Sequence, residues 1–133
     1  MSYMLDTNIC IYLMKHNLTV LGKFLELKEN NISISTITLA ELEFGICNSI
    51  AYEKNRAKLL SLLPLIKIQS FDDLAAVEYG IIRADLKKRG KIIGQLDMLI
   101  AAHAKSRNLT LVTNNTGEFE RIEGLTLDNW LAA

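Results

Sequence analysis

The chain begins with a short apolar run that stops abruptly at a carboxylate. Residues Tyr3–Leu5 suit a buried strand, and Asp6, Thr7 and Asn8 follow directly. The apolar residues of 9–13 then recur at a spacing typical of a helix. Asp6 is therefore expected at the carboxyl end of a first strand, where open α/β sheets build their ligand crevices.

Strand and helix patterns alternate through the rest of the chain. This alternation predicts an α/β fold with a mainly parallel central sheet flanked by helices. No repeat, low-complexity segment or linker interrupts it, so residues 1–133 are expected to form one domain. Strands are expected at 3–5, 32–35, 65–68 and 109–113, helices at 7–15, 20–28, 38–46, 51–63, 72–88 and 96–106, and a short tail near Trp130.

Composition narrows the class of protein. Half of the residues are hydrophobic and one is proline, which is typical of a compact chain. Fifteen basic residues balance fifteen acidic ones, so any nucleic-acid contact must come from local patches. Cys10 and Cys47 match no metal or redox spacing and are expected to be buried free thiols in a reducing cytoplasm. Without 18 consecutive apolar residues or a signal segment, we expect no membrane association.

Three carboxylates stand out, although two of them fit helix starts equally well. Asp6 precedes a helix and could act as its N-cap. Glu41 completes the pattern Thr38-x-x-Glu41, which is also a capping box. For these two residues, a capping role and a functional role remain open on local pattern alone.

Asp97 is harder to explain by local structure. Residues 96–104 are almost wholly apolar apart from Asp97 and His103. A carboxylate on a burying helix face is costly unless it is paired or bound to a metal. Asp97 could still cap its helix after Gly94, and His103 is expected to be a structural histidine. The pattern favours a functional role for Asp97.

Carboxylates that converge on one crevice repel each other unless a cation lies between them. Hard oxygen ligands select Mg²⁺ or Mn²⁺, and Mg²⁺ is commonly completed by a substrate phosphate. Such a site suits phosphodiester hydrolysis.

Four segments together resemble the PIN-domain ribonucleases, and within them the VapC toxins of VapBC toxin–antitoxin pairs. The resemblance covers essentially the whole chain. The order and spacing of the segments carry it: Met4–Asn8, Thr38–Leu42, Ile93–Ala104 and Leu111–Phe119.

The resemblance implies a Mg²⁺-dependent endoribonuclease, with Mn²⁺ as a possible substitute, that cuts structured RNA, commonly tRNA, and so inhibits translation. By this similarity Asp6, Glu41 and Asp97 are the metal-binding acids. Asp6 and Asp97 would hold the main ion, and Glu41 would orient the attacking water. The Thr113 hydroxyl would lie near the metal.

One position departs from the family pattern. Many PIN domains carry an acid where Asn115 stands, so the resemblance implies one firmly bound ion here, with Glu118 as a partial substitute. Thr7 and Asn8 would support the site.

The resemblance also implies partners: a second copy in a homodimer, and a VapB-type antitoxin whose tail occupies the active-site groove. The complex would bind operator DNA through the antitoxin. Local residues add a candidate RNA-binding cluster, which could also be a solvated helix end that complements the helix dipole. Its members are Arg83, Lys87, Lys88, Arg89 and Lys91, whereas Lys54, Arg56 and Lys58 are expected to be plain surface.

Three rival interpretations remain. A haloacid-dehalogenase-like phosphatase also starts with a strand that ends in Asp, but its chemistry needs a second Asp two residues later, where this chain has Asn8. A phosphoacceptor receiver domain needs a Lys at the end of a late strand, and the strand ending at Thr113 has none. An inactive PIN scaffold that binds RNA or a partner is the third.

Overall fold

Five parallel strands form the centre of the molecule in a computed structural model that describes residues 1–132. Their order across the sheet is β3-β2-β1-β4-β5, and every neighbouring pair is parallel. The strands are β1 (Ser2–Leu5), β2 (Asn31–Ser35), β3 (Lys67–Gln69), β4 (Thr110–Val112) and β5 (Leu127–Asp128).

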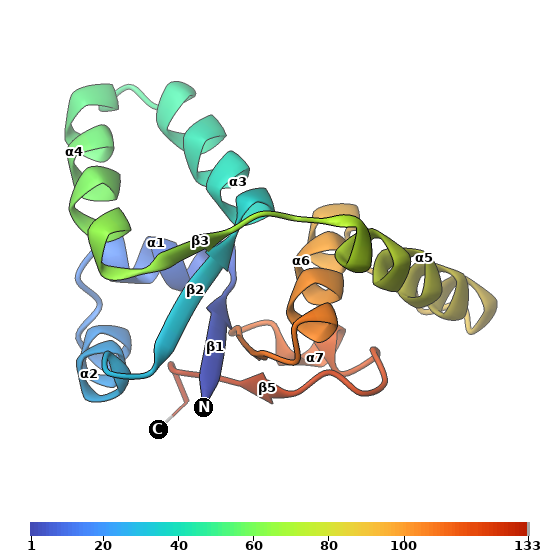
Figure 1. Cartoon of the computed structure of the whole chain (residues 1–133). Coiled ribbons are helices and arrows are strands. Elements are labelled where there is room, and N and C mark those ends of the chain that lie inside the picture. The colour runs from blue at the N-terminus through green and yellow to red at the C-terminus, as the bar shows by residue number, and fades with distance from the viewer. Residues whose placement is uncertain (133) are drawn as a thin grey trace.

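Helices cover both faces of this sheet (Figure 1), as expected for parallel strands whose two sides must be shielded from water. The predicted α/β architecture is therefore confirmed. The helices are α1 (Thr7–Met14), α2 (Leu18–Leu27), α3 (Thr36–Cys47), α4 (Tyr52–Leu62), the 3₁₀ turn η1 (Leu63–Leu65), α5 (Asp73–Lys88), α6 (Gln95–Ser106) and α7 (Thr116–Phe119).

The core divides into two apolar clusters, one on each face of the sheet. Successive residues of β1 alternate between them, because neighbouring side chains of a strand point to opposite faces. Leu5 packs with residues of α1, α2, α3 and α4, whereas Met4 packs with residues of α5, α6 and α7. Both side chains are fully buried.

The strand order places a topological switch point beside β1. From β1 the chain moves to β2 and β3 on one side, and only later adds β4 on the other side of β1. The connections that leave β1 and β4 therefore diverge, which opens a crevice at the carboxyl ends of the strands. Asp6 and Thr113 follow these two strands directly.

Some predicted elements are wrong in position or were missed. The third strand was expected at 65–68 but occupies Lys67–Gln69, because Pro64 lies in the 3₁₀ turn that precedes it. The short tail contains α7 and the edge strand β5, which pairs with β4. Both are too brief to show a periodicity of their own.

The helical pair α3 and α4 extends beyond the carboxyl ends of the strands (Figure 1). Cys47 lies at the outer end of α3 and is exposed, so the expectation that it is buried was wrong. Cys10, in contrast, is buried in the core as predicted. Among residues 1–132, no helix combines the length and the apolar character needed to cross a membrane.

Candidate active site

Asp6 occupies the junction between β1 and α1. Its Oδ1 accepts a hydrogen bond of 3.0 Å from the Ile9 amide, so Asp6 caps α1, and its side chain is almost completely buried. Burial raises the pKa of Asp6, and the charge of Glu41 raises it further, while hydrogen bonds from Thr113 and from the Ile9 amide oppose the rise. Asp6 therefore both caps α1 and interacts electrostatically with Glu41.

Glu41 lies within α3 and faces α1. Its Oε1 accepts a hydrogen bond of 2.6 Å from the Thr7 hydroxyl. The capping-box interpretation of Thr38 and Glu41 is wrong, because α3 begins earlier and Ser35 is its N-cap. Thr38 is instead fully buried inside the helix, and its hydroxyl has no hydrogen-bond partner among the described residues.

Asp97 lies in the first turn of α6 and is half-buried. Burial, and then the charges of Glu41, Asp6 and Glu118, raise the pKa of Asp97 to about 6. Gly94 caps this helix without a side-chain hydrogen bond, so Asp97 does not act as the cap. A Cβ at Gly94 would stand 3.4 Å from Asp97 Oδ2, so glycine leaves the approach to this carboxylate open.

The end of β4 adds residues on the other side of the crevice. Thr113 is fully buried, and its Oγ1 accepts a hydrogen bond of 2.9 Å from the backbone N–H of Asn115. Glu118 lies in α7, and its charge acts on Asp97. The Asn115 side chain makes no hydrogen bond within the described part of the chain. The fold thus brings a fourth acid, Glu118, to the three that sequence motifs indicated.

The donor set fits a hard divalent cation. Carboxylates from the β1–α1 junction, α3 and α7 act electrostatically on Asp97 in α6, and this repulsion contributes to its raised pKa. Across residues 1–132, no three His, Cys, Asp or Glu side chains form a closed chelating group. Mg²⁺ does not require one, because it usually binds through one or two carboxylates and completes its shell with waters and substrate phosphates.

His103 has a structural environment, as predicted. It is fully buried, its Nδ1 lies 2.8 Å from Ser35 Oγ, and its ring meets Phe71 edge to face. Burial lowers the pKa of His103, which favours the neutral ring. No acid of the crevice contributes to this shift.

The predicted basic cluster at the end of α5 divides into two kinds of side chain. Arg83 donates a 2.8 Å hydrogen bond to Tyr79, and Arg89 forms a 2.6 Å ion pair with Asp85. The remaining members are exposed and form no ion pair within residues 1–132; they are Lys87, Lys88 and Lys91.

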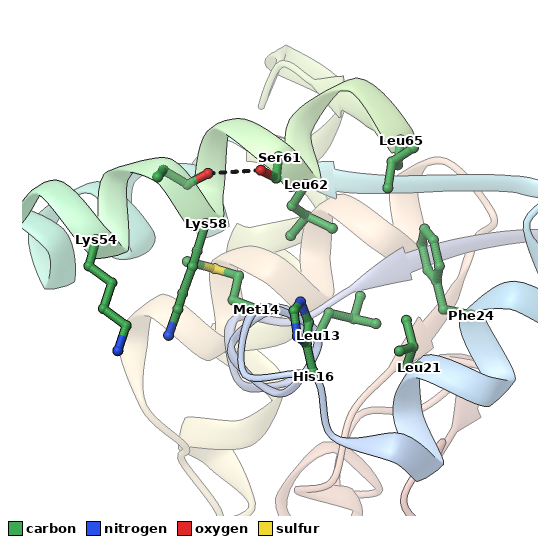
Figure 2. Close-up of a pocket in the computed structure, with 11 residues that line it drawn as sticks. Leu13, Met14, His16, Leu21, Phe24, Lys54, Lys58, Ser61, Leu62 and Leu65 are labelled. Atoms are coloured by element: carbon green, nitrogen blue, oxygen red, sulfur yellow. Dashed lines mark hydrogen bonds between the residues drawn. The ribbon is translucent and has the colours of Figure 1, made fainter.

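Two cavities lie on the α1 side of the molecule. The larger, of about 480 Å³, is mainly apolar and lies between α1, α2 and α4 (Figure 2). None of the four acids lines it. The smaller, of about 200 Å³, lies between α1, α3 and α4, and Glu41 forms part of its wall. Lys58 lines both cavities, which differs from the plain surface position expected for it.

A five-stranded parallel sheet with helices on both faces is the fold of the PIN-domain nucleases. The PIN-domain family pattern matches residues 3–125, and the chain belongs to this family.

Among characterised relatives, the similarity is to VapC ribonucleases. The chain is 46% identical to ribonuclease VapC2 of Rickettsia felis over 132 residues, covering 98% of both chains. It is 40% identical to the tRNA(fMet)-specific endonuclease VapC of Shigella flexneri over 130 residues, again covering 98% of both.

Solved structures show the same similarity. The crystal structure of VapBC2 from Rickettsia felis, bound to a DNA fragment from its promoter, matches with a TM-score of 0.94 and 45% identity, covering 98% of this chain and 99% of that one. The DNA-bound VapBC of Salmonella typhimurium matches with a TM-score of 0.92 and 39% identity, covering 98% of both chains.

Proposed function

We propose that the protein is a divalent-metal-dependent endoribonuclease toxin of a VapBC toxin–antitoxin pair. The observation that carries this proposal is the environment of Asp97, whose pKa is raised to about 6 by burial and by three other carboxylates. Carboxylates that lie close together despite their mutual repulsion are typical of a site that binds a cation in its active form. The similarity to VapC ribonucleases supports the same activity.

Asp6 and Asp97 would hold one Mg²⁺ or Mn²⁺ ion, and Glu41 would orient the attacking water. The ion, when bound, would polarise the scissile phosphate and acidify a bound water. Glu41 is suited to its role because the Thr7 hydroxyl fixes Oε1 at 2.6 Å. Fixing this carboxylate in advance reduces the reorganisation needed in the transition state.

At the end of β4, the Thr113 hydroxyl would lie beside the ion and Asn115 would hydrogen-bond to the substrate. Thr113 is held in place by burial and by the Asn115 amide. Asn115 brings no charge, so one firmly bound ion is expected, and Glu118 supplies the additional negative charge near Asp97.

The substrate would be structured RNA, with tRNA as the first choice. One relative is named a tRNA(fMet)-specific endonuclease. The exposed lysines 87, 88 and 91 offer cations for the phosphate backbone.

The partners would be a VapB-type antitoxin and a second copy of the chain. Related structures are VapBC complexes, two of them bound to DNA, so operator DNA would be reached through the antitoxin. The apolar cavity between α1, α2 and α4 offers an apolar antitoxin segment a surface to bind (Figure 2).

The test is cleavage of total tRNA by the purified protein with Mg²⁺, with EDTA, and by Asp6→Asn and Asp97→Asn variants. We expect discrete fragments that disappear on chelation and in both variants, while the exposed-acid control Glu29→Gln keeps full activity. Cleavage that persists in the folded variants would overturn the site. If no form cleaves but the protein retains tRNA, the inactive-scaffold alternative would hold.

A further inference from the structure

The smaller cavity, bounded by α1, α3 and α4, has one of the four acids, Glu41, in its wall. From Glu41 the wall follows α3 through Leu42, Gly45 and Ile46. On the opposite side it follows α1 through Ile11 and Met14 to Lys15. Lys15 is eight residues beyond Thr7 in the sequence, so it lies about 12 Å further along the direction of α1.

The lining of this cavity is mainly apolar, and its charged members are Lys15, Lys58 and Glu41. Ile11, Met14, Leu42 and Ile46 supply apolar surface, and the volume is about 200 Å³. Lys15 and Lys58 also line the cavity, and neither forms an ion pair within residues 1–132. An apolar pocket with unpaired cations beside it suits a ligand that has an apolar ring and an anion.

Asn55 adds a polar group to the same cavity. Its Nδ2 donates a hydrogen bond of 3.2 Å to Ser49 Oγ, which fixes the orientation of the amide. Its carbonyl oxygen and second N–H remain available to a ligand. A fixed amide in an apolar pocket can distinguish one base edge from another.

We propose that this cavity binds the base of an RNA nucleotide next to the scissile bond, while Lys15 and Lys58 hold its phosphate. This subsite rests on the proposed ribonuclease function and extends it to base preference. Sequence-specific RNA recognition commonly takes an unstacked base into such a pocket and reads its edge by hydrogen bonds. The two unpaired lysines favour a nucleotide, which carries a phosphate, over a neutral peptide segment.

Gly45 offers a direct way to fill the cavity. It lines the pocket, and a Cβ built on it meets no atom within 4 Å, so the backbone has room for the first carbon of the side chain in Gly45→Leu. Gly22 in α2 has equally open surroundings but does not line this cavity, which makes Gly22→Leu the matched control. Both changes replace glycine within a helix, where a side chain favours the fold.

The first experiment does not depend on catalysis. Methyl-¹³C-methionine protein is titrated with each of the four 5′-mononucleotides, and the Met14 methyl signal is followed by NMR with the signals of Met1, Met4 and Met98 as internal references. We expect a saturable Met14 shift in the wild type and in Gly22→Leu, strongest for one base, and its loss in Gly45→Leu. An unchanged shift in Gly45→Leu, no shift in the wild type, or a shift caused only by an oligoglutamate peptide would overturn the subsite.

The second experiment reads the subsite through cleavage. A randomised RNA pool is cut with Mg²⁺, and the fragment ends are sequenced. We expect a base preference beside the cut in the wild type that falls roughly tenfold or more in Gly45→Leu. Lys15→Gln/Lys58→Gln should weaken cutting of all sequences alike. EDTA-sensitive cleavage with the same preference in Gly45→Leu would overturn the subsite alone, whereas failure of EDTA-sensitive cleavage would overturn the ribonuclease function.

Discussion

The Thr7 hydroxyl donates a hydrogen bond of 2.6 Å to Glu41 Oε1 and so connects the first turn of α1 to α3. Thr7 is the residue after Asp6, so the same turn that presents one acid also holds a second. Hydrogen bonds to an ionised carboxylate are shorter and stronger than neutral ones. This contact therefore fixes the relative position of two acids that come from distant parts of the sequence.

Replacing Thr7 by Val keeps the shape of the side chain and removes this donor. We expect kcat for RNA cleavage to fall about tenfold, the equivalent of roughly 1.5 kcal/mol, while KM changes little. The Thr7→Ser variant, which restores the hydroxyl, should recover most of the rate. Steady-state kinetics on one RNA substrate measure the effect, and equal kcat values for the Val variant and the wild type would exclude this role.

The raised pKa of Asp97 predicts how the metal-free protein responds to pH. Its pKa is raised from 3.8 to about 6, so between these values the unfolded chain loses a proton that the native state retains. Stability should therefore fall as pH rises from about 4 to 6, and the loss should persist above pH 6. The full shift corresponds to roughly 3 kcal/mol, but solvent screening of the half-buried group reduces the expected loss to about 1 kcal/mol.

Urea unfolding in EDTA tests this prediction. Asp97→Asn cannot ionise, so its free energy of unfolding should decline less over the same pH range and exceed that of the wild type at pH 7. Added Mg²⁺ should stabilise the wild type but not the variant, because the ion binds the native carboxylate. Identical pH profiles for the two proteins would contradict the assigned electrostatics.

The three exposed lysines near the end of α5 should contribute to RNA affinity through phosphate contacts. In an Asp97→Asn background, which leaves the RNA intact, we expect Lys87→Gln/Lys88→Gln/Lys91→Gln to weaken tRNA binding at all sequences. The slope of log affinity against log salt should fall by about 0.7 for each contact that is lost. Fluorescence anisotropy at several salt concentrations measures the slope.

A second triple variant distinguishes local phosphate contacts by the lysines near α5 from an effect of the net charge of the protein. Lys23→Gln/Lys28→Gln/Lys67→Gln removes the same number of positive charges from α2, its C-terminal end and β3. Its salt slope should equal that of the parent protein. Equal losses in both triple variants would show that the lysines near α5 act only through net charge.

An exposed apolar stripe on α5 is the surface through which the proposed homodimer would form. Leu74, Val77 and Ile81 are 64%, 62% and 55% exposed and lie on one side of a helix that extends away from the sheet (Figure 1). Val77→Glu should convert a dimer of twice 14.9 kDa into a monomer, as measured by light scattering. Leu60→Glu changes an equally exposed residue on α4 and should leave the mass unchanged. A dimer that survives Val77→Glu would place the interface elsewhere.

Local pattern was sufficient for the architecture and for the position of the first acid. The alternation of strand and helix patterns predicted a parallel α/β sheet, and Asp6 could be placed at a strand end because a short apolar run precedes it and a helical spacing follows it. Asp97 could be singled out for a similar reason, since a charge within an apolar helix face carries an energetic cost that is visible in the sequence.

Local pattern failed where the determining contacts are distant in the sequence. The two-residue strand β5 exists because it pairs with β4, and Cys47 is exposed because α3 continues past the core. The capping box at Thr38 was plausible locally, but pairing of β2 with β1 and β3 fixes where that strand ends and thus where α3 begins.

The sequence by itself determined the class of fold, the strand end that bears Asp6, and the polar residues available for a hydrolytic site. Only the tertiary structure decided which of them lie together: Glu118 acts on Asp97, Thr7 holds Glu41, and Lys15 and Lys58 line one cavity. The physical reason is that periodicity and capping arise from neighbours along the chain. Electrostatic coupling and pocket shape, in contrast, depend on distances that exist only after the strands have paired.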